Sequence, residues 1–270
     1  MTDRDHPADD ATAAKARVLA QYGSVGDAYV RSTGFAVAND LSRMVELAQP
    51  LPTDRVLDIA TGGGHVAVTF APHVAQVIAS DLTPEILHHA AAYFAERGLA
   101  NVETALADAE DLPFADDSFQ IVTCRIAPHH FPRPDRFVAE VARVLTPDGR
   151  FVLIDSTVDA GELGDFFNRM ERLRDPSHVR ALSNAEWEVL LAGAGLRVEV
   201  RESYRKHHDF DDWTARSRMA PEDKATLAQA ILKAPAAWRD ALQVETDADT
   251  HRLVGFSDTK TLFLARRHMA

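Results

Sequence analysis

The feature that most constrains the fold of this chain is a glycine-rich turn between an apolar strand and a helix. The segment reads Val56-Leu57-Asp58-Ile59-Ala60-Thr61-Gly62-Gly63-Gly64-His65, and a second apolar strand follows it and ends at Asp81. A strand, a glycine turn, a helix and an acid-tipped second strand form the unit that places a nucleotide-type site at the carboxyl edge of a parallel sheet. The sequence therefore predicts both a fold and the position of a ligand site.

The rest of the chain alternates short apolar strands with helices. We expect strands at 56–59, 77–80, 102–106, 121–124, 151–155, 196–204 and 261–265, with helices at 64–70, 84–97 and 133–145 between the first five. Such alternation indicates a parallel sheet that helices cover on both faces, with right-handed crossovers. The predicted fold class is α/β, a doubly wound, mostly parallel, seven-stranded Rossmann-like sheet with an N-terminal helical cap and inserted lid helices.

Helical segments precede and interrupt this sheet. Residues 1–50 are expected to form the N-terminal helical cap, with helices at 11–22 and 36–48 and no regular structure in the first ten residues. Residues 51–270 are expected to form the Rossmann-like domain, with a lid insertion at about 158–183 and a helical insertion at about 211–242. Ser183, followed three residues later by Glu186, predicts the start of a helix between the two insertions.

Composition excludes several classes of function. The net charge of −12 argues against a nucleic-acid partner, because such proteins gain affinity by neutralising phosphates with Lys and Arg. Cys124 is the only cysteine, which rules out an internal disulfide and a cysteine-built zinc site. The sequence contains no run of about 18 apolar residues, the length that a membrane-spanning helix needs. Met1 to Asp10 lack the features of a signal peptide. We expect a cytoplasmic protein with no membrane span.

The glycine turn by itself allows two kinds of ligand. Its sequence satisfies the dinucleotide pattern G-x-G-x-x-G/A, so an NAD(P)-dependent oxidoreductase is one alternative. Asp58, just before the turn, argues against it, since a carboxylate there would repel a pyrophosphate by roughly 4 kcal/mol per charge pair at an effective dielectric near 20. The ammonium of S-adenosylmethionine would be attracted instead. Asp58 could also simply cap the turn or pair with Arg55.

Two further acids follow the next two strands. Asp81 can accept both ribose hydroxyls of such a ligand, and Asp108 can accept the exocyclic amine of adenine. Leu82 or Phe114 could cover the faces of the adenine ring. An acidic loop that faces water is the alternative for Asp108. Three acids at three successive strand ends favour the ligand site.

These segments resemble the motifs of the class I S-adenosylmethionine-dependent methyltransferases, in the branch that includes the ubiquinone and menaquinone methylases. Residues 56–64 resemble motif I, 78–81 the acidic motif and 108–109 the adenine motif, and 116–122 and 140–150 resemble the next two. Residues 125–131 and 173–178 resemble a YcgJ-like subgroup of bacterial small-molecule methyltransferases. The resemblance implies cofactor contacts from Asp58, Ala60, Thr61, Gly62, Gly64, Asp81, Leu82, Asp108, Ala109 and Arg125.

The chain departs from the family pattern at two positions of the turn. Ala60 replaces the first glycine, which is tolerable if its backbone keeps a negative φ, because an L-residue adopts that conformation without strain. His65 occupies the fourth position. Both departures are compatible with ligand binding, although either could weaken it.

The resemblance implies methyl transfer to an O, N or C nucleophile of a small organic molecule. His129 and His130 follow the fourth strand, and either could take a proton from the nucleophile. Alternatively they cap the next helix or pack under Phe131, and a metal site is not expected there. The Asn/Asp-Pro-Pro-Tyr/Phe motif of methyltransferases that act on bases or amides is absent from 124–130. A non-catalytic S-adenosylmethionine-binding module remains a further alternative.

Residues outside the strand ends could complete the substrate site. Tyr22, Arg174 and His178 are the candidates for substrate contacts, and a salt-bridged loop explains the last two equally well. The N-terminal helices with Tyr22, Tyr29 and Phe35 resemble the family's cap over the cofactor, and aromatic packing of an amphipathic helix is the alternative for each of the three. Asp155, which ends the fifth strand, reads more readily as a turn cap than as a polar contact.

Overall fold

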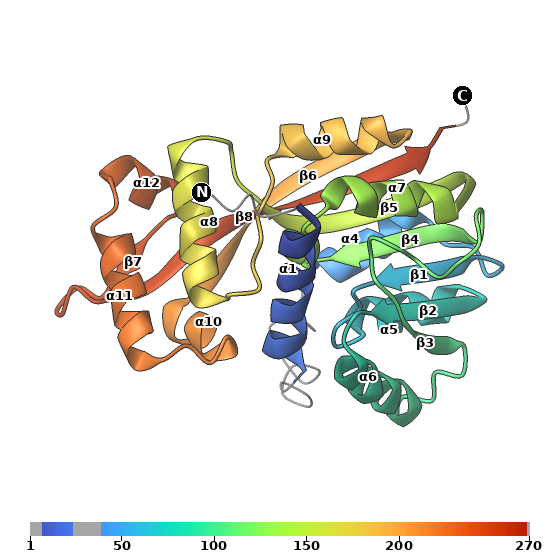
Figure 1. Cartoon of the computed structure of the whole chain (residues 1–270), viewed down its shortest axis with the longest axis horizontal. Coiled ribbons are helices and arrows are strands. Elements are labelled where there is room, and N and C mark those ends of the chain that lie inside the picture. Colours follow the sequence, from blue (N-terminus) through green and yellow to red (C-terminus); the bar gives the residue numbers. More distant parts are fainter. Residues whose placement is uncertain (1–6, 24–38, 269–270) are drawn as a thin grey trace.

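A mixed sheet forms the centre of the computed structural model, which describes residues 7–23 and 39–268 (Figure 1). The strands follow one another in space as β3-β2-β1-β4-β5-β8-β6, and β7 pairs with β8 outside this path. Strands β1 to β5 are parallel, whereas β8 runs antiparallel to β5, β6 and β7. The strands are β1 (Arg55–Ile59), β2 (Gln76–Asp81), β3 (Val102–Leu106), β4 (Phe119–Arg125), β5 (Leu145–Thr157), β6 (Leu196–Asp209), β7 (Glu245–Thr246) and β8 (Leu253–Arg267).

Helices cover both faces of this sheet, because its central strands carry apolar side chains on both sides. Along β1, Val56 packs with α4 (Asn39–Ala48), α5 (His65–Phe70) and α6 (Pro84–Glu96). The next residue, Leu57, points to the opposite face and packs with α7 (Pro134–Val144) and α9 (Asn184–Gly193). This two-sided burial produces the doubly wound architecture that the strand pattern predicts.

A third apolar cluster lies at the extended ends of β6 and β8. It joins α8 (Glu162–Arg174), α10 (Phe210–Arg216) and α11 (Pro221–Leu232) around Trp213 and Phe256. Figure 1 shows these helices, with the short α12 (Ala236–Ala241), gathered at one end of the sheet. The extended strands therefore carry a second helical layer beside the carboxyl edge of β4 and β5.

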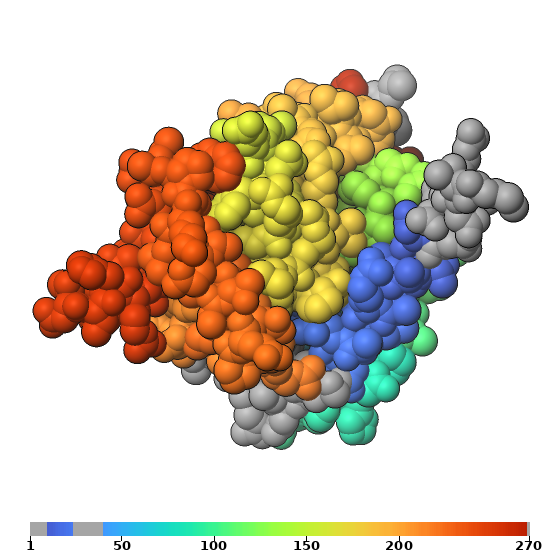
Figure 2. Space-filling model, turned by 60° about the vertical axis from the view of Figure 1, so that its left-hand side comes forward, coloured from blue at the N-terminus to red at the C-terminus, as the bar shows by residue number. Residues whose placement is uncertain are grey.

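Helix α1 (Pro7–Tyr22) lies outside the sheet layers. Figure 2 shows it on the surface, next to the yellow segment around α8. It is joined to other elements by Lys15, which contacts the loop after β3, by Tyr22, which contacts the loops after β4 and α8, and by the carbonyl of Gln21, which accepts from Arg218. The helix therefore lies over the carboxyl edge of the parallel strands.

The α/β class and all seven predicted strands are confirmed, although several strands are longer than predicted and β7 adds an eighth pairing segment. The capping box at Ser183 and Glu186 starts α9 as predicted. The prediction that the first ten residues lack regular structure is wrong for residues 7–10, because α1 begins at Pro7. The predicted helix at 36–48 begins at Asn39, while Tyr29, Phe35 and residues 36–38 lie outside the described residues. In the described parts of the chain, no helix is long and apolar enough to cross a membrane.

Candidate active site

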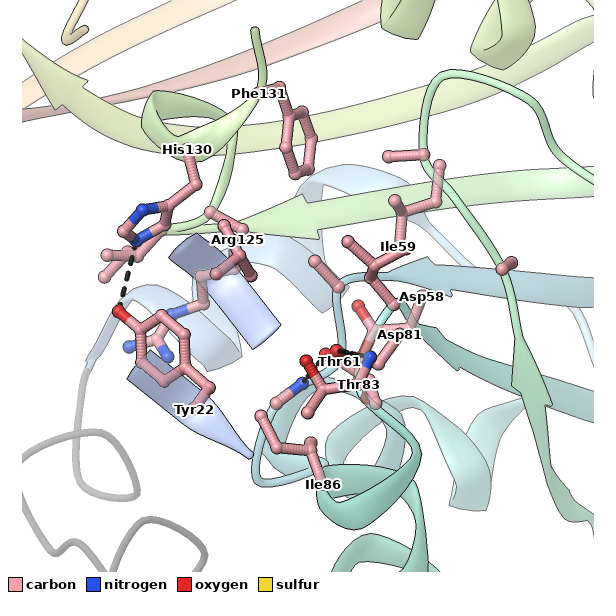
Figure 3. A pocket seen from close by; sticks show the side chains of 18 of the residues that line it. Tyr22, Asp58, Ile59, Thr61, Asp81, Thr83, Ile86, Arg125, His130 and Phe131 are labelled. Atoms are coloured by element: carbon pink, nitrogen blue, oxygen red, sulfur yellow. Dashed lines mark hydrogen bonds between the residues drawn. The ribbon is translucent and has the colours of Figure 1, made fainter. Parts of the chain in front are cut away.

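A pocket opens at the carboxyl ends of β1, β2 and β4, where the strand order reverses (Figure 3). This is the position at which doubly wound sheets bind ligands. Four sequence segments line it, and α1 contributes Lys15, Val18 and Tyr22 from the open side. Nine of the ten predicted cofactor residues line the pocket, namely Asp58, Ala60, Thr61, Gly62, Asp81, Leu82, Asp108, Ala109 and Arg125.

Asp58 is held by hydroxyl groups rather than by a cation. Its carboxylate is 1% exposed and accepts hydrogen bonds from Thr61 Oγ1 at 2.6 Å and Thr123 Oγ1 at 2.8 Å. The suggested pairing with Arg55 does not occur, because that guanidinium binds Gln76 and the carbonyl of Ser118. Burial raises the pKa of Asp58 to about 6, against the lowering effect of the two hydroxyl donors. A cationic group of a ligand would therefore favour its ionised form.

The glycine turn requires left-handed backbone at three of its residues. Gly62 has a φ of 53° and Gly64 a φ of 78°, and Ala60 adopts 52°. The condition of a negative φ at Ala60 is thus not met: the chain must leave β1 sharply so that Thr61 N can donate to the carbonyl of Ser80 at 2.8 Å. An L-residue in this conformation stores strain, which the surrounding turn must offset.

Gly64 is the predicted cofactor residue that does not line the pocket. A Cβ at this position would come within 2.4 Å of the ring of Phe94 on α6. Its role is therefore to let the turn pass close to α6 so that the start of α5 faces the pocket. His65 follows it, and burial lowers the pKa of this imidazole.

Asp81 ends β2 and holds the turn from the other side. Its Oδ2 accepts from Gly62 N at 3.1 Å and its Oδ1 from Thr83 N at 2.9 Å. Burial raises the pKa of Asp81 against these hydrogen bonds. Leu82, the next residue, lines the pocket as well. A second carboxylate thus lies beside the glycine turn, on the neighbouring strand.

Asp108 lines the far end of the pocket. Its side chain does not simply face water, because Lys15 Nζ of α1 lies 2.6 Å from Asp108 Oδ2 and 2.6 Å from Glu110 Oε2. Of the two residues suggested to cover an adenine ring, Leu82 lines the pocket, whereas Phe114 packs edge-on against Phe119 and does not.

Arg125, the last residue of β4, is held by an acid that no local sequence pattern predicts. Its guanidinium makes two hydrogen bonds of 3.1 Å to the carboxylate of Asp40 in α4, and both side chains are buried. Tyr204 on β6 also donates to Asp40 at 2.9 Å. The arginine therefore forms a rigid, charged wall of the pocket.

The comparisons with known proteins agree with this geometry. The chain matches the methyltransferase domain family over residues 57–153. It is 42% identical to the uncharacterized methyltransferase YcgJ of Bacillus subtilis over 183 residues, which are 67% of this chain and 72% of YcgJ. The chain belongs to the class I S-adenosylmethionine-dependent methyltransferases of the YcgJ/UbiE-like type.

Two further relatives agree with this assignment. The methyltransferase is 33% identical to the ubiquinone/menaquinone biosynthesis C-methyltransferase UbiE of Pseudomonas putida, over 67% of this chain and 70% of that protein. A solved structure of a candidate methyltransferase from Bacillus halodurans superimposes with a TM-score of 0.83 at 37% identity, and covers 86% of this chain and 100% of that one. Methyl transfer from S-adenosylmethionine is therefore the activity of this family, and the oxidoreductase and non-catalytic alternatives are not favoured.

The two predicted catalytic histidines of this methyltransferase face different cavities. They lie in a single 3₁₀ turn, Pro128–His130, and neither caps α7. His130 lines the pocket, where its Nε2 lies 3.2 Å from the hydroxyl of Tyr22 and its Nδ1 3.0 Å from the carbonyl of Ser177 (Figure 3). Tyr22 also donates to Asp175 at 3.0 Å. Burial, reinforced by His129, lowers the pKa of His130 to about 4.

His129 lines a second cavity. Ile126 lines both this cavity and the first pocket, so the two adjoin there. Residues from β5, α8, β6, α10 and β8 complete this second cavity. The predicted substrate residue Arg174 lies here, pairs with Glu171 at 2.9 Å and stacks over the ring of Trp213. The residues that the sequence predicts for one substrate site therefore belong to two adjoining cavities.

His178, the third predicted substrate residue, lines neither cavity. Its Nε2 lies 2.8 Å from Oδ1 of Asn168, and burial lowers the pKa of its ring. It therefore supports the loop after α8 from inside.

Sequence reasoning missed several charged residues that line or support the two cavities, among them Lys15, Asp40, Glu110, Lys206 and Lys260. Asp155 was assigned to a turn cap, and its Oδ1 does accept from the backbone N of Ser156 at 2.8 Å. The same atom lies 2.6 Å from His129 Nδ1, so it also holds a histidine. The position of Asp155 at a strand end was the only signal for this second role.

Proposed function

We propose that this chain binds S-adenosylmethionine in the pocket at the carboxyl edge of β1, β2 and β4, and transfers its methyl group to an O, N or C nucleophile of a small organic molecule. The observation that carries the proposal is the set of three acids, Asp58, Asp81 and Asp108, which line one pocket from three successive strand ends. Each can serve a different polar group of the cofactor.

The charges of the pocket fit this cofactor. Asp58 and Asp81 are both at least nine-tenths buried, and burial raises the pKa of each. Keeping two such carboxylates ionised is costly without a cation nearby. S-adenosylmethionine has an ammonium, a sulfonium and no phosphate, so it would favour the ionised acids where a dinucleotide would meet repulsion.

The polar groups of the pocket divide along its length. Asp58 and the backbone of the turn from Ala60 to Gly62 would hold the methionine end. Asp81 would accept the ribose hydroxyls, and Asp108 with Leu82 would hold the adenine. The bound cofactor supplies a methyl group on a positively charged sulfur, and the residues of the chain orient it and exclude water.

A small acceptor agrees with the surroundings of the pocket. Helix α1 lies over its open side, through the contacts of Lys15 and Tyr22. The second cavity adjoins it through Ile126. The net charge of −12 disfavours a polyanionic acceptor such as nucleic acid.

Calorimetric titration with S-adenosylhomocysteine tests the proposal. We expect micromolar binding to the wild-type protein and at least a tenfold weaker affinity for Asp81→Asn, because an amide offers one acceptor oxygen in place of two. Asp111→Asn, which removes the same charge from an exposed acid outside the pocket, should bind like the wild type. Absence of binding at millimolar concentration, or preferential binding of NAD⁺, would contradict the proposal.

A further inference from the structure

A buried hydrogen bond joins a histidine of the second cavity to a carboxylate. His129 Nδ1 is 2.6 Å from Asp155 Oδ1, and the side chains are 9% and 0% exposed. A carboxylate in this position holds the imidazole as the Nδ1–H tautomer, which leaves a lone pair on Nε2. His129 lines the second cavity, and with Nδ1 bound to Asp155 its Nε2 is the ring nitrogen left for a molecule bound there.

The neighbouring histidines cannot take this role. Both ring nitrogens of His130 lie within hydrogen-bond distance of a partner, Tyr22 on one side and Ser177 on the other. His178 bonds Asn168 and lines no cavity. Among the histidines of the 3₁₀ turn and of the loop after α8, His129 alone combines a carboxylate partner with a place in a cavity wall. His208 on β6 also lines the second cavity beside a carboxylate, but that carboxylate, Asp258, is shared with Lys260.

The backbone between the two cavities is itself unusual. Ile126 follows β4 with a φ of 53°, which is rare for a β-branched residue. Its N–H donates to the carbonyl of Ile154 at 2.7 Å, so the chain turns back over β5 instead of leaving the sheet. This turn places the His129 ring against Asp155 at the end of β5 and leaves the Ile126 side chain on the boundary of both cavities.

Charged groups of both signs line this cavity with His129, and the acids are Glu171, Asp209 and Asp212. Lys206 from β6 and Lys260 from β8 line it, and Lys260 Nζ is held by Asp258 at 2.8 Å. Arg174 is paired with Glu171, while His208 lies 3.2 Å from Asp258. Burial, with Lys260 nearby, lowers the pKa of Lys206 to about 8. Ammonium groups in this position can stabilise negative charge that develops on a bound molecule.

We propose that the second cavity holds the methyl acceptor and that His129, positioned by Asp155, is the general base that removes a proton from it. The acceptor is therefore a molecule whose nucleophilic atom carries an ionisable O–H or N–H proton. In the transfer, the nucleophile forms a bond to the methyl carbon, the carbon–sulfur bond breaks with its electron pair left on sulfur, and the proton passes to His129 Nε2. This inference rests on the proposed function, since it needs the methyl donor in the adjoining pocket.

The first test needs no acceptor. Nuclear magnetic resonance of the protein with ¹⁵N-labelled histidine, saturated with S-adenosylhomocysteine, reports the tautomer of His129, which the spectrum of His129→Gln assigns. We expect the Nδ1–H tautomer with an unprotonated Nε2 at pH 8, and its loss in Asp155→Asn. An Nε2–H tautomer, or an unchanged tautomer in Asp155→Asn, would overturn the proposal.

The second test follows the methyl group. The enzyme is incubated with trideuteromethyl-labelled S-adenosylmethionine and bacterial metabolite extracts, and labelled products are identified by mass spectrometry. We expect the label on oxygen or nitrogen, with kcat lowered at least a hundredfold in His129→Gln and about tenfold or more in Asp155→Asn. KM for the acceptor should change little in Asp155→Asn, and His88→Gln, an exposed histidine on α6, should match the wild type.

The outcomes separate this inference from the proposed function. Absence of S-adenosylhomocysteine binding by the wild-type protein would refute the proposed function itself. Retained binding with undiminished methylation by His129→Gln, or label on an atom that had no proton to lose, would overturn the role of His129 alone. If no labelled product forms, the tautomer of His129 in the first test supports or overturns the proposed role of that residue.

Discussion

The ammonium of Lys15 lies 2.6 Å from Asp108 Oδ2 and 2.6 Å from Glu110 Oε2, and so joins helix α1 to the wall of the candidate cofactor pocket. Seven residues further along the same helix, Tyr22 reaches His130 and Asp175. The helix is thus anchored near both ends of the pocket. These polar anchors act together with Ala14, which is buried, and Val18, which lines the pocket, to hold α1 over its open side.

Removing the first anchor should loosen the closed pocket. We expect Lys15→Ala to speed the release of S-adenosylhomocysteine about two- to fivefold, since partly exposed ion pairs contribute roughly 0.2–1 kcal/mol. Stopped-flow dissociation measures this rate. Arg17→Ala removes the same charge from an exposed position on α1 and should leave it unchanged. Tighter binding by Lys15→Ala would mean that Lys15 competes with the ligand for Asp108.

Neutralising Asp58 should stabilise the free protein at alkaline pH. Burial raises the pKa of Asp58 to about 6, above its ordinary value of 3.8, so this group favours the folded state below pH 4 and loses that contribution as pH rises through 6. Asp58→Asn should therefore exceed the wild type by about 2 to 3 kcal/mol in free energy of unfolding at pH 8. The difference should shrink towards pH 4.

Urea denaturation at both pH values measures the effect, and binding supplies the contrast. The same variant should bind S-adenosylhomocysteine at least tenfold more weakly, because the ammonium loses its partner. A variant that is less stable than the wild type at pH 8 would show that the two threonine hydroxyls offset the burial of the charge.

Relieving backbone strain at Ala60 should also stabilise the protein. Its φ of 52° costs an L-residue about 1 kcal/mol that glycine does not lose, so Ala60→Gly should raise the free energy of unfolding by about that amount. Ala95→Gly, the same substitution at an exposed position in α6, should lower it by about 1 kcal/mol. Chemical denaturation distinguishes the two signs, and an equal loss in both variants would refute the strain at Ala60.

The opposite change at Gly64 should be harmful. Gly64→Ala introduces a Cβ 2.4 Å from Phe94 in a left-handed turn, and we expect a loss of about 2 to 4 kcal/mol in stability with at least tenfold weaker S-adenosylhomocysteine binding. Gly98→Ala has a similar φ of 67° with no atom within 4 Å of the new Cβ. It should lose only the strain, about 1 kcal/mol. Equal losses in the two variants would exclude the contact with Phe94 as the cause.

The parts of the fold that repeat locally could be predicted from the sequence. Apolar strands such as 56–59 and the capping box at Ser183 carry their signals within a few residues. The acids at Asp58, Asp81 and Asp108 were found because parallel strands end at one edge, so equivalent positions converge. The family resemblance added Arg125 and Ala109, which line the same pocket.

Contacts between distant segments could not be predicted. Lys15 and Asp108 are 93 residues apart, and Asp40 and Arg125 are 85 residues apart, so neither pair leaves a local pattern. The sign of φ at Ala60 stayed open because the resemblance predicts the turn but not the backbone conformation of a residue that replaces its glycine. His129 and His130 line different cavities because of the left-handed turn at Ile126, and a single sequence does not predict that backbone conformation.

The position of β8 has a consequence for synthesis of the chain. This strand lies between β5 and β6 and pairs with both, yet it is made after them. Until Leu253–Arg267 has left the ribosome, β5 and β6 keep open edges that can pair with other chains. The parallel strands that form the candidate cofactor pocket precede this step, so the pocket can be shaped before the sheet is closed. A stop codon shortly before Leu253 should therefore yield an aggregating protein, even though every residue of the candidate cofactor pocket is present.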